Sequence, residues 1–415
     1  MTTAPRIFSM EYYSDPFPTL KQMREHEPVA RVSPPFADID LWLVSRYDDI
    51  RNLATDRRLT VDAKVASERF RRSGLAMGVG TNWEKAFVVN QRDNVRQRKL
   101  IGATHTPRMT AGWTPMISEI ASALLDRMPT DMVGEYGYPL ASTTIATVLG
   151  IRESDHELMR GWADAATGAD RAASTQALRD TLDYIGEQIK VKRKQPADDL
   201  LTLLINASDG DDRLDDEEIA AIAGNLFIAG TDTTANFFAN AVAALLDHPD
   251  QLDLLRADPA LMDQAVDEVL RYSNPVILSP GFRHALEPIE LHGTVIPEGG
   301  TVGFLLAAAN RDPRVYDEPD ALRITRTDAP HLGFGYGPNH CVGSALARLE
   351  CKIGLASLLD RHPRLDLGVD RTELTHRISP FMYGFNRLPL ATHSATPTTS
   401  TAAETTSTSP AEVLA

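Results

Sequence analysis

The sequence predicts a mainly helical protein with small β-sheets, and the strongest support is one long helical pattern. It begins at Leu214 and continues to His248, where Pro249 stops it. The pattern covers roughly 33 residues, or about 50 Å at 1.5 Å per residue, which is long enough to cross a whole domain. Shorter helical patterns lie on both sides of it, and short apolar strand patterns flank a turn at 297–300.

The other elements follow in order along the chain. A strand at 41–44 should lead into a helix. Asp215 and Glu218 have the spacing of a capping box at the start of the long helix, and Gly150 is a C-cap for an earlier one. Helices are expected at residues 19–26, 48–55, 93–101, 116–125, 138–149, 152–166, 174–194, 198–204, 214–248, 258–271 and 344–360, and strands at 41–44, 289–296 and 301–305.

Length and charge limit the class of protein. A chain of 415 residues can form one large domain or several ordinary ones. The net charge of −15 argues against nucleic acid as a partner, since phosphate binding requires a basic surface. No apolar run is long enough to span a membrane, and no secretion signal is evident. The two cysteines make no disulfide framework, so the composition indicates a soluble cytoplasmic protein.

A glycine-rich loop around one cysteine is the segment most indicative of chemistry. In 334–343, two glycines precede Cys341 and one follows it, and an apolar helical pattern starts near Leu346. Glycines let the backbone turn and approach a flat ligand, while the following helix N-terminus stabilises a negative sulfur. A single fixed thiolate is what a haem iron requires as an axial ligand. The alternative is a glycine-rich turn that holds an inert, buried cysteine.

Polar residues interrupt the middle of the long helix. Residues 229–234, Ala-Gly-Thr-Asp-Thr-Thr, combine a glycine with three threonines, all poor helix formers. Threonine hydroxyls can bond back to carbonyls and bend a helix, so the segment indicates either a functional groove or an ordinary polar kink. Further along the chain, Glu268 and Arg271 share a helix face at i and i+3 and can form an ion pair.

Together these segments resemble the cytochrome P450 family. The cysteine loop matches the family pattern Phe-Gly-x-Gly-x-His-x-Cys-x-Gly at every fixed position except one, where the histidine is Asn339. The segment that starts at Ala229 matches the family's oxygen-binding groove in full. Glu268, Arg271 and the later Arg326 match the family's Glu-x-x-Arg motif and the arginine that joins it, a structural lock on the cysteine side.

The resemblance covers roughly residues 10–390, with its motifs in the family's order. It implies the mainly helical cytochrome P450 fold as a single domain, with the long central helix over the haem. Residues 1–9 would form an N-terminal extension. Residues 391–415 are rich in Thr, Ser and Ala, a composition that cannot build a core, so we expect a disordered tail.

The resemblance also implies how the cofactor is held. The cofactor would be haem b, with Cys341 as the axial thiolate ligand. Arg98 and Arg283 would hold the haem propionates, because a guanidinium pairs with a carboxylate through a planar fork. Asn94 and Asn339 stand where the family has histidines. Asparagine still donates a neutral hydrogen bond, so we expect retained haem binding with weaker electrostatic anchoring at these two positions.

Proton supply and the substrate pocket follow from the same resemblance. Asp232 and Thr233 would deliver protons to dioxygen as general acid–base groups. Asn225 and Ile228, four positions and one position before Ala229, are expected to share its face and look into the pocket. Asn225 is polar where an aliphatic residue is common, and we expect it to hydrogen-bond a polar group of the substrate. The expected pocket residues are Phe87, Val88, Asn225, Ile228, Ala229, Ile277, Leu278, Phe381 and Met382.

The implied function is that of a haem-thiolate monooxygenase that oxidises a small, largely apolar organic substrate of secondary metabolism, by hydroxylation or epoxidation. The chain carries no flavin or nicotinamide fingerprint, so electrons would come from a ferredoxin and its reductase. We expect a monomer that uses dioxygen and binds neither membrane nor nucleic acid. The alternatives are oxidative coupling or ring closure without oxygen insertion, a haem-binding sensor or carrier without turnover, and a helical scaffold without haem.

Overall fold

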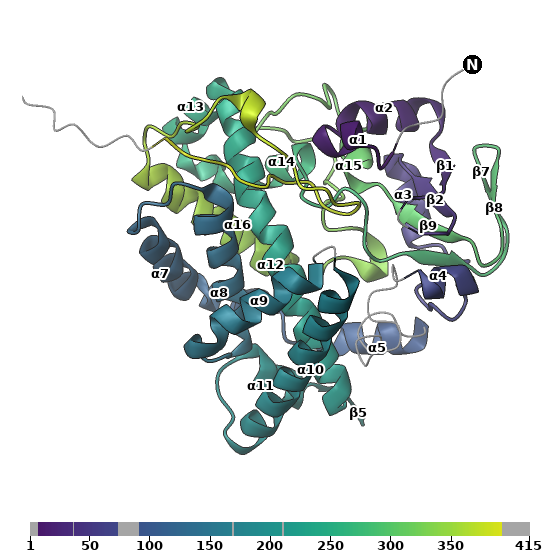
Figure 1. The fold of residues 1–415 in the computed structure, drawn as a ribbon, viewed down its shortest axis with the longest axis horizontal. Coiled ribbons are helices and arrows are strands. Elements are labelled where there is room, and N and C mark those ends of the chain that lie inside the picture. The colour runs from purple at the N-terminus through teal and green to yellow at the C-terminus, as the bar shows by residue number, and fades with distance from the viewer. Residues whose placement is uncertain (1–6, 36, 74–90, 168–169, 210, 392–415) are drawn as a thin grey trace, which may run out of the picture.

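The computed structural model describes residues 7–35, 37–73, 91–167, 170–209 and 211–391, and its central element is helix α12, Asp216–Asp247. Figure 1 shows α12 running through the middle of the molecule, with other helices packed around it. Asp215 caps this helix and forms the capping box with Glu218, which confirms the predicted start. Most side chains of α12 are buried, so packing on nearly all sides holds it in place.

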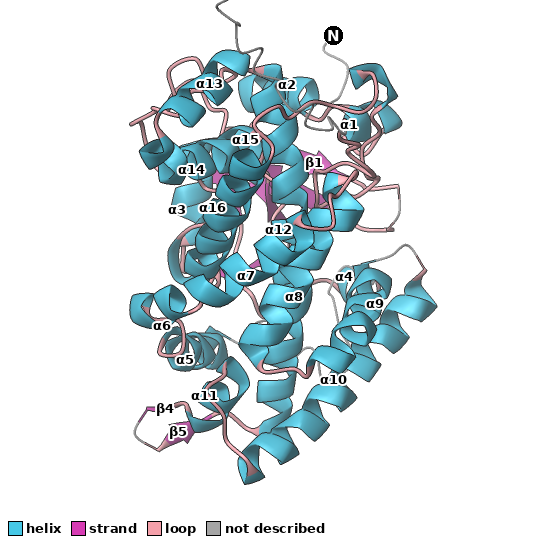
Figure 2. Cartoon of the chain, turned by 90° about the vertical axis from the view of Figure 1, so that its left-hand side faces the viewer, coloured by secondary structure: helices cyan, strands magenta, loops and turns pink. Residues whose placement is uncertain are grey.

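The remaining helices surround α12, as Figures 1 and 2 show from two directions. Within the described part of the chain, no helix combines the length and the apolar character that crossing a bilayer would require. The helices before α12 are α1 Met10–Ser14, α2 Phe17–His26, α3 Tyr47–Ala54, α4 Glu68–Arg72, α5 Gln91–Gly102, α6 Pro107–Gly112, α7 Thr114–Leu125, α8 Tyr138–Leu149, α9 His156–Thr167, α10 Arg171–Lys194 and α11 Leu200–Asn206. Those after it are α13 Pro249–Ala257, α14 Met262–Tyr272, α15 Leu306–Ala309 and α16 Ser344–Arg361.

A five-stranded sheet lies beside the helices, in the order β1-β2-β9-β6-β3. β2 and β9 are parallel, and the other neighbours are antiparallel. The single strand expected at 289–296 is wrong: this segment is the β7–β8 hairpin, because His292 and Gly293 turn the chain with positive φ angles of 51° and 76°. The strands are β1 Val29–Val32, β2 Leu41–Val44, β3 Leu59–Thr60, β4 Ser208–Asp209, β5 Asp212–Arg213, β6 Arg283–Ala285, β7 Ile289–Leu291, β8 Thr294–Ile296 and β9 Thr301–Phe304.

Most of the other predicted elements are present, with small differences at their ends. The strand expected at 41–44 is β2, and Gly150 ends α8 in the left-handed conformation with φ of 74°. The helix expected from Arg152 begins only at His156, because a 3-10 turn at Glu153–Asp155 precedes it.

Close contact between α12 and α16 depends on a missing side chain. A Cβ at Gly354 of α16 would lie 2.6 Å from the ring of Phe238 on α12. The carbonyl of the same glycine accepts a hydrogen bond of 2.7 Å from the hydroxyl of the buried Tyr136. The helix that follows the cysteine loop is therefore held directly against the central helix.

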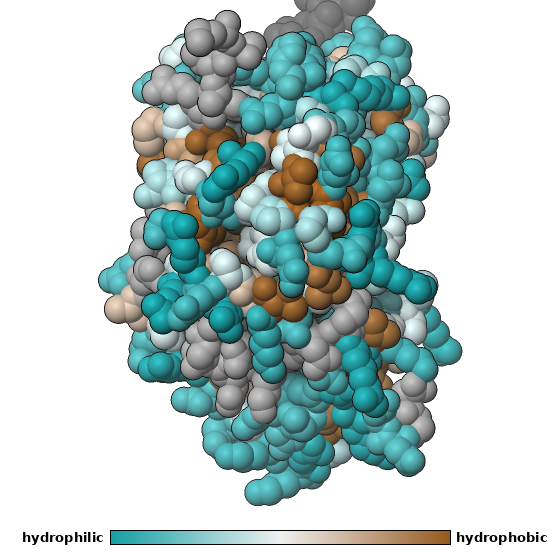
Figure 3. Space-filling view, turned by 90° about the vertical axis from the view of Figure 1, so that its right-hand side faces the viewer, coloured by the Kyte–Doolittle hydropathy of each residue, from teal (hydrophilic) through white to brown (hydrophobic). Residues whose placement is uncertain are grey.

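The face of the molecule in Figure 3 is mainly hydrophilic, with hydrophobic side chains in small groups. Among the described residues, Leu286 and Val295, near and within the β7–β8 hairpin, are apolar and 46% and 57% exposed. Apolar residues that are exposed singly are normal on soluble proteins and need no partner to explain them.

A buried ion-pair cluster ties α14 to the segment that precedes the cysteine loop. Arg271 donates to both carboxylate oxygens of Glu268, at 2.7 and 2.9 Å, and Arg326 donates to the same carboxylate at 3.2 Å. The other donors of Arg271 reach the carbonyls of Asn310 and Ala321, at 2.9 and 2.8 Å. The structure thus brings together the three residues expected to form a structural lock.

Removal of the acid should destabilise the protein strongly. In Glu268→Ala, the buried guanidinium of Arg271 loses its counter-charge and that of Arg326 keeps only Asp328, so we expect a loss of about 3–5 kcal/mol in the free energy of unfolding, measured by urea denaturation. The matched control is Asp263→Ala on the same helix, which removes an exposed pair with Lys352 and should cost at most about 1 kcal/mol. Equal effects of the two substitutions would contradict the structural role of Glu268.

Candidate active site

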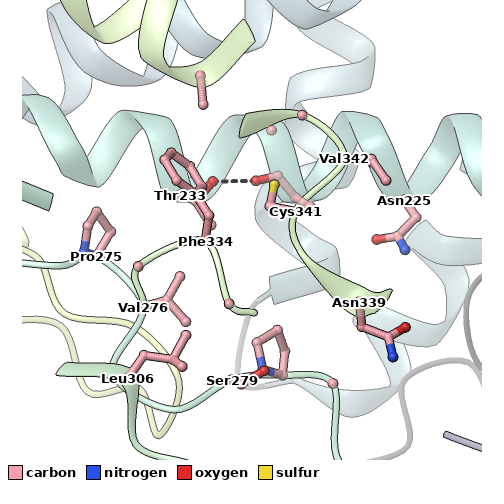
Figure 4. Close-up of a pocket in the computed structure, with 18 of the residues that line it drawn as sticks. Asn225, Thr233, Pro275, Val276, Ser279, Leu306, Phe334, Asn339, Cys341 and Val342 are labelled. Carbon is pink, nitrogen blue, oxygen red and sulfur yellow. Dashed lines mark hydrogen bonds between the residues drawn. The ribbon is translucent and has the colours of Figure 1, made fainter. Parts of the chain in front are cut away.

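A cavity of about 410 Å³ lies beside α12, between that helix, the cysteine loop and the segment at 274–284. Figure 4 shows its lining: Asn225 and Thr233 project from α12, while Cys341 and Asn339 come from the cysteine loop. Most of its lining is apolar. The cavity therefore brings together parts of the chain that lie more than a hundred residues apart in sequence.

The cysteine loop has the backbone that its glycines predict. Gly335 and Gly337 have φ angles of 73° and 72°, and a Cβ at Gly337 would lie 2.8 Å from the side chain of Thr55. The Cys341 amide donates to the Phe334 carbonyl at 2.8 Å, which closes the loop just before α16. The sulfur is thus presented to the cavity on a rigid loop.

Cys341 is exposed toward the open cavity, and the loss of bulk water around its sulfur controls the charge of the thiol. This loss of water raises the pKa of the Cys341 thiol, while the Gly343 amide and the cations Arg98 and Arg348 act in the opposite direction. The groups expected to stabilise a negative sulfur are present, but in the protein alone burial has the larger effect on the pKa of the thiol. A coordinated metal ion would deprotonate such a thiol outright.

Arg98 and Arg283 both line the cavity. Arg98 on α5 donates to the carbonyl of His340 at 2.7 Å, and Arg283 at the start of β6 donates to its neighbour's carbonyl at 3.2 Å. Burial, together with the positive charge of Arg98, lowers the pKa of Arg283 to about 10. The two guanidinium groups repel each other, and an anion bound between them would offset this repulsion. The site therefore suits a ligand with carboxylates.

The two asparagines expected at the cofactor differ in position. Asn339 lines the cavity, as Figure 4 shows. Asn94 is fully buried in α5, and it is not among the described residues that line the cavity. Although Asn94 and Arg98 are one turn apart on the same helix, only the longer side chain reaches the cavity.

These residues fit a haem group. The cavity offers one cysteine sulfur on a glycine-rich loop, two cations for two carboxylates (the partly exposed Arg98 and the buried Arg283), and walls that are largely apolar. Cys341 would hold the metal and Arg98 and Arg283 the propionates, with Asn339 beside them. When bound, haem would supply the redox chemistry of dioxygen, which no protein side chain can supply.

The polar segment of α12 contributes Thr233 to the cavity. The Thr233 hydroxyl donates to the Ala229 carbonyl at 2.6 Å, one turn earlier, and Thr231 does the same to Phe227 at 2.8 Å. The helix continues through the segment without interruption. Asn225, Ala229 and Thr233 follow one another at i and i+4, so they form one stripe along the cavity.

The side chain of Asp232, the residue before Thr233, points away from the cavity. Its carboxylate accepts hydrogen bonds from the Tyr138 hydroxyl, from the Arg377 guanidinium and, at 3.2 Å, from Asn236. It is 8% exposed and is not among the described residues that line the cavity. Sequence reasoning missed Tyr138 and Arg377, since they lie far from Asp232 in the chain and belong to none of the motifs named above.

The structure corrects the expected place of several pocket residues. Asn225 and Ala229 line the cavity, but Ile228 lies in the hydrophobic core, because consecutive helical residues point about 100° apart. Ile277 and Leu278 also lie in the core, whereas Val276 and Ser279 line the cavity. The residues at 276–279 belong to no regular strand, and the two in the middle both face the core, so their side chains do not simply alternate between the core and the cavity.

The other expected pocket residues lie on the C-terminal segment and before α5. Phe381 packs against the core formed around Ile277, and the Ile277 amide donates to its carbonyl at 2.8 Å. Met382 pairs with Val276 in an isolated bridge, but unlike Val276 it is not among the described residues that line the cavity. Phe87 and Val88 lie outside the described residues.

Two histidines that the sequence reasoning missed also line the cavity, His105 and His284. Burial lowers the pKa of both groups, that of His284 to about 4. His105 lies seven positions after Arg98, beyond the end of α5, and His284 follows Arg283 directly.

Comparison with known proteins shows which family the chain is similar to. The family model described as Cytochrome P450 matches residues 165–367. The cytochrome P450 monooxygenase PikC of Streptomyces venezuelae is 37% identical over 402 residues, which covers 94% of this chain and 95% of PikC.

Solved structures of similar proteins have the same fold as this chain. The structure of the Bacillus subtilis 168 bacillaene polyketide synthase cytochrome P450 PksS has a TM-score of 0.86 and 30% identity, and it covers 94% of this chain and 99% of that one. CxnD, a cytochrome P450 enzyme for C–S bond formation in chuangxinmycin biosynthesis, has a TM-score of 0.83 and 30% identity, covering 94% and 98%. The chain therefore belongs to the cytochrome P450 family, oxidoreductases that bind haem through a cysteine thiolate and incorporate oxygen from dioxygen.

Proposed function

We propose that this monooxygenase takes electrons from a ferredoxin and its reductase and hydroxylates or epoxidises a small, largely apolar substrate of secondary metabolism. The observation that carries the proposal is that Cys341 and Thr233 line one largely apolar cavity. Haem held by Cys341 would supply dioxygen chemistry, and the protein would position the substrate and supply protons. In this proposal the Thr233 hydroxyl hands on a proton and Asp232, the next residue back, supplies it.

The lining of the cavity supports the substrate class. Apolar walls bind an organic molecule by burial of apolar surface, and most of the cavity lining is apolar. Asn225 adds one polar group on α12 that can fix the orientation of a substrate. The similar enzyme PksS belongs to a bacillaene polyketide synthase, which supports an apolar natural-product substrate.

A second candidate reaction is oxidative coupling or ring closure. It is favoured by one observation, the similarity to CxnD, an enzyme for C–S bond formation. The product mass separates the two reactions: a gain of one oxygen atom indicates hydroxylation or epoxidation, and a loss of two hydrogen atoms indicates coupling. Reduction by a ferredoxin–reductase pair, followed by absorbance under carbon monoxide, tests the proposed electron donor.

Replacement of the proposed metal ligand should abolish the haem signature. Cys341→Ala should lose the thiolate-type ferrous–carbon monoxide spectrum, because the metal loses its sulfur ligand. The matched control is Cys351→Ala, which removes the other thiol at the cavity and should leave the spectrum unchanged. An unaltered spectrum in Cys341→Ala, or its loss in Cys351→Ala, would reject the assignment.

Removal of the cavity hydroxyl should uncouple electron use from product formation. In Thr233→Ala we expect product per electron pair to fall about tenfold and hydrogen peroxide to rise, because proton transfer is impaired. Thr231→Ala is the control, since its buried hydroxyl makes the same kind of bond to a carbonyl without facing the cavity. Undiminished product without extra peroxide would favour a haem carrier or a peroxide-driven enzyme.

Asn225 should contribute to substrate affinity. Loss of one hydrogen bond in Asn225→Leu should weaken binding by roughly two- to tenfold, as measured by the spectral shift on substrate titration. The effect should vanish for a substrate analogue that lacks the polar group. If affinity and product pattern stay the same with the intact substrate, Asn225 has no part in recognition.

A further inference from the structure

A second polar network lies between α14, the cysteine loop and α16, and its centre is the carboxylate of Asp267. Consecutive residues of a helix point about 100° apart, so Glu268 faces the buried ion-pair cluster while Asp267 faces α16. One oxygen of Asp267 accepts a hydrogen bond of 2.7 Å from Nε of Arg348 and one of 3.3 Å from Nε2 of His331. A single carboxylate therefore joins a residue just before the loop to a residue just after it.

The hydrogen bonds of His331 fix its ring and the position of its proton. Nδ1 accepts a hydrogen bond of 2.9 Å from the Gly333 amide, so Nδ1 carries no proton. The ring proton is therefore on Nε2, which donates to Asp267. Only 5% of the His331 side chain is exposed. The backbone that enters the cysteine loop is in this way tied to α14 through one imidazole ring.

Arg348 covers the aromatic ring with which the loop begins. Its guanidinium carbon lies 4.5 Å from the centroid of the Phe334 ring, a distance at which a cation is attracted to the face of the ring. The ring of His331 lies 5.6 Å from the same centroid. The carbonyl of Phe334 accepts the 2.8 Å hydrogen bond from the Cys341 amide, and Figure 4 shows both residues on the loop. Displacement of Arg348 or His331 would therefore disturb the residue that holds the Cys341 amide.

The charge of Arg348 acts on the sulfur. Together with the charge of Arg98, it acts to lower the pKa of the Cys341 thiol, against the larger effect of the loss of bulk water. For Asp267, burial acts to raise the pKa, but the hydrogen bonds from His331 and Arg348 lower it overall, so the carboxylate stays negative. Asp267 and Arg348 thus form an ion pair whose positive member acts on the proposed metal ligand.

We propose that Asp267 is a positioning residue that sets how readily the haem held at Cys341 accepts an electron, by balancing the positive charge of Arg348. A positive charge near the thiolate favours the reduced haem, which has one electron more, and a neighbouring carboxylate opposes this effect. None of the three side chains of the network is among the described residues that line the cavity, so each acts through the loop. The inference goes beyond the proposed function, but it rests on the ligation by Cys341 that is part of it.

The test measures the one-electron reduction of the haem from ferric to ferrous in a titration with dithionite. In Arg348→Gln the cation is lost, so we expect the equilibrium constant for reduction to fall about three- to tenfold, which corresponds to a potential about 30–60 mV more negative. In Asp267→Asn the balancing charge is lost while one acceptor oxygen remains, so we expect a rise of about two- to fivefold. Arg348→Lys, which keeps the charge, should restore most of the loss.

Asp263 and Lys352 supply the matched control. They lie one turn before Asp267 on α14 and one turn after Arg348 on α16, and they form an ion pair of 2.8 Å between the same two helices. The charge of Lys352 does not affect the pKa of the Cys341 thiol, so Asp263→Asn and Lys352→Gln should leave the potential unchanged. A merely structural role of Asp267 would not give shifts of opposite sign in Arg348→Gln and Asp267→Asn, because both substitutions weaken the same contact.

A second readout reports on the position of the loop. Asp267→Ala loses the hydrogen bonds to both His331 and Arg348, and we expect haem to transfer to apomyoglobin about three- to tenfold faster than from the wild type. Asp263→Ala should transfer haem at the wild-type rate. Equal rates in the two variants would overturn the positioning role.

The outcomes also separate this inference from the proposed function. If the wild-type protein shows no thiolate-type ferrous–carbon monoxide spectrum, the proposed ligation by Cys341 fails. If that spectrum is present but Arg348→Gln and Asp267→Asn shift the potential in the same direction, or no more than the control variants do, the inference fails and the proposed function stands. Should Arg348→Gln bind no haem, the comparison of Asp267→Asn with Asp263→Asn decides alone.

Discussion

The site depends on one constraint, the burial of α12 on nearly every side. A helix in that position cannot slide or rotate without breaking contacts with α8, α10 and α16. Gly354 lets α16 approach α12 closely, and α16 begins directly after the loop that carries Cys341. The distance between the sulfur and the threonine hydroxyl is therefore set by core packing and not by a flexible loop.

The same constraint allows polar groups in the middle of the core. Threonine hydroxyls in α12 bond to the helix's own carbonyls, so their burial leaves no unpaired donor. Asp232 finds its partners on α8 and on the C-terminal segment. Most of these polar groups bond to the helix itself or to an element that packs on it, which helps α12 to stay continuous through a segment of poor helix formers, whereas the buried side-chain oxygens of Asn236 and Asn240 accept no hydrogen bond.

Local features were predictable from the sequence, and contacts between distant segments were not. The cap of α12, the C-cap Gly150 and the cysteine loop depend on neighbouring residues, so the pattern contains them. The hairpin turn at His292 was missed because the two short strand patterns on either side of His292 and Gly293 were taken together as one strand. Arg377 could not be found, since it lies 145 positions from Asp232 and nothing local distinguishes it from an exposed arginine.

The asparagines in place of histidines change how the cofactor would be anchored. A histidine changes its charge near neutral pH, whereas asparagine is neutral and arginine stays charged. In the proposed arrangement the positive charge toward the propionates comes from Arg98 and Arg283, whose guanidinium groups are fixed by bonds to backbone carbonyls. Asn339 adds a neutral hydrogen-bond donor at the cavity. Asn94, on α5, is fully buried and is not among the described residues that line the cavity. The electrostatic anchor of this chain therefore has two members, and their charge does not vary with pH across the physiological range.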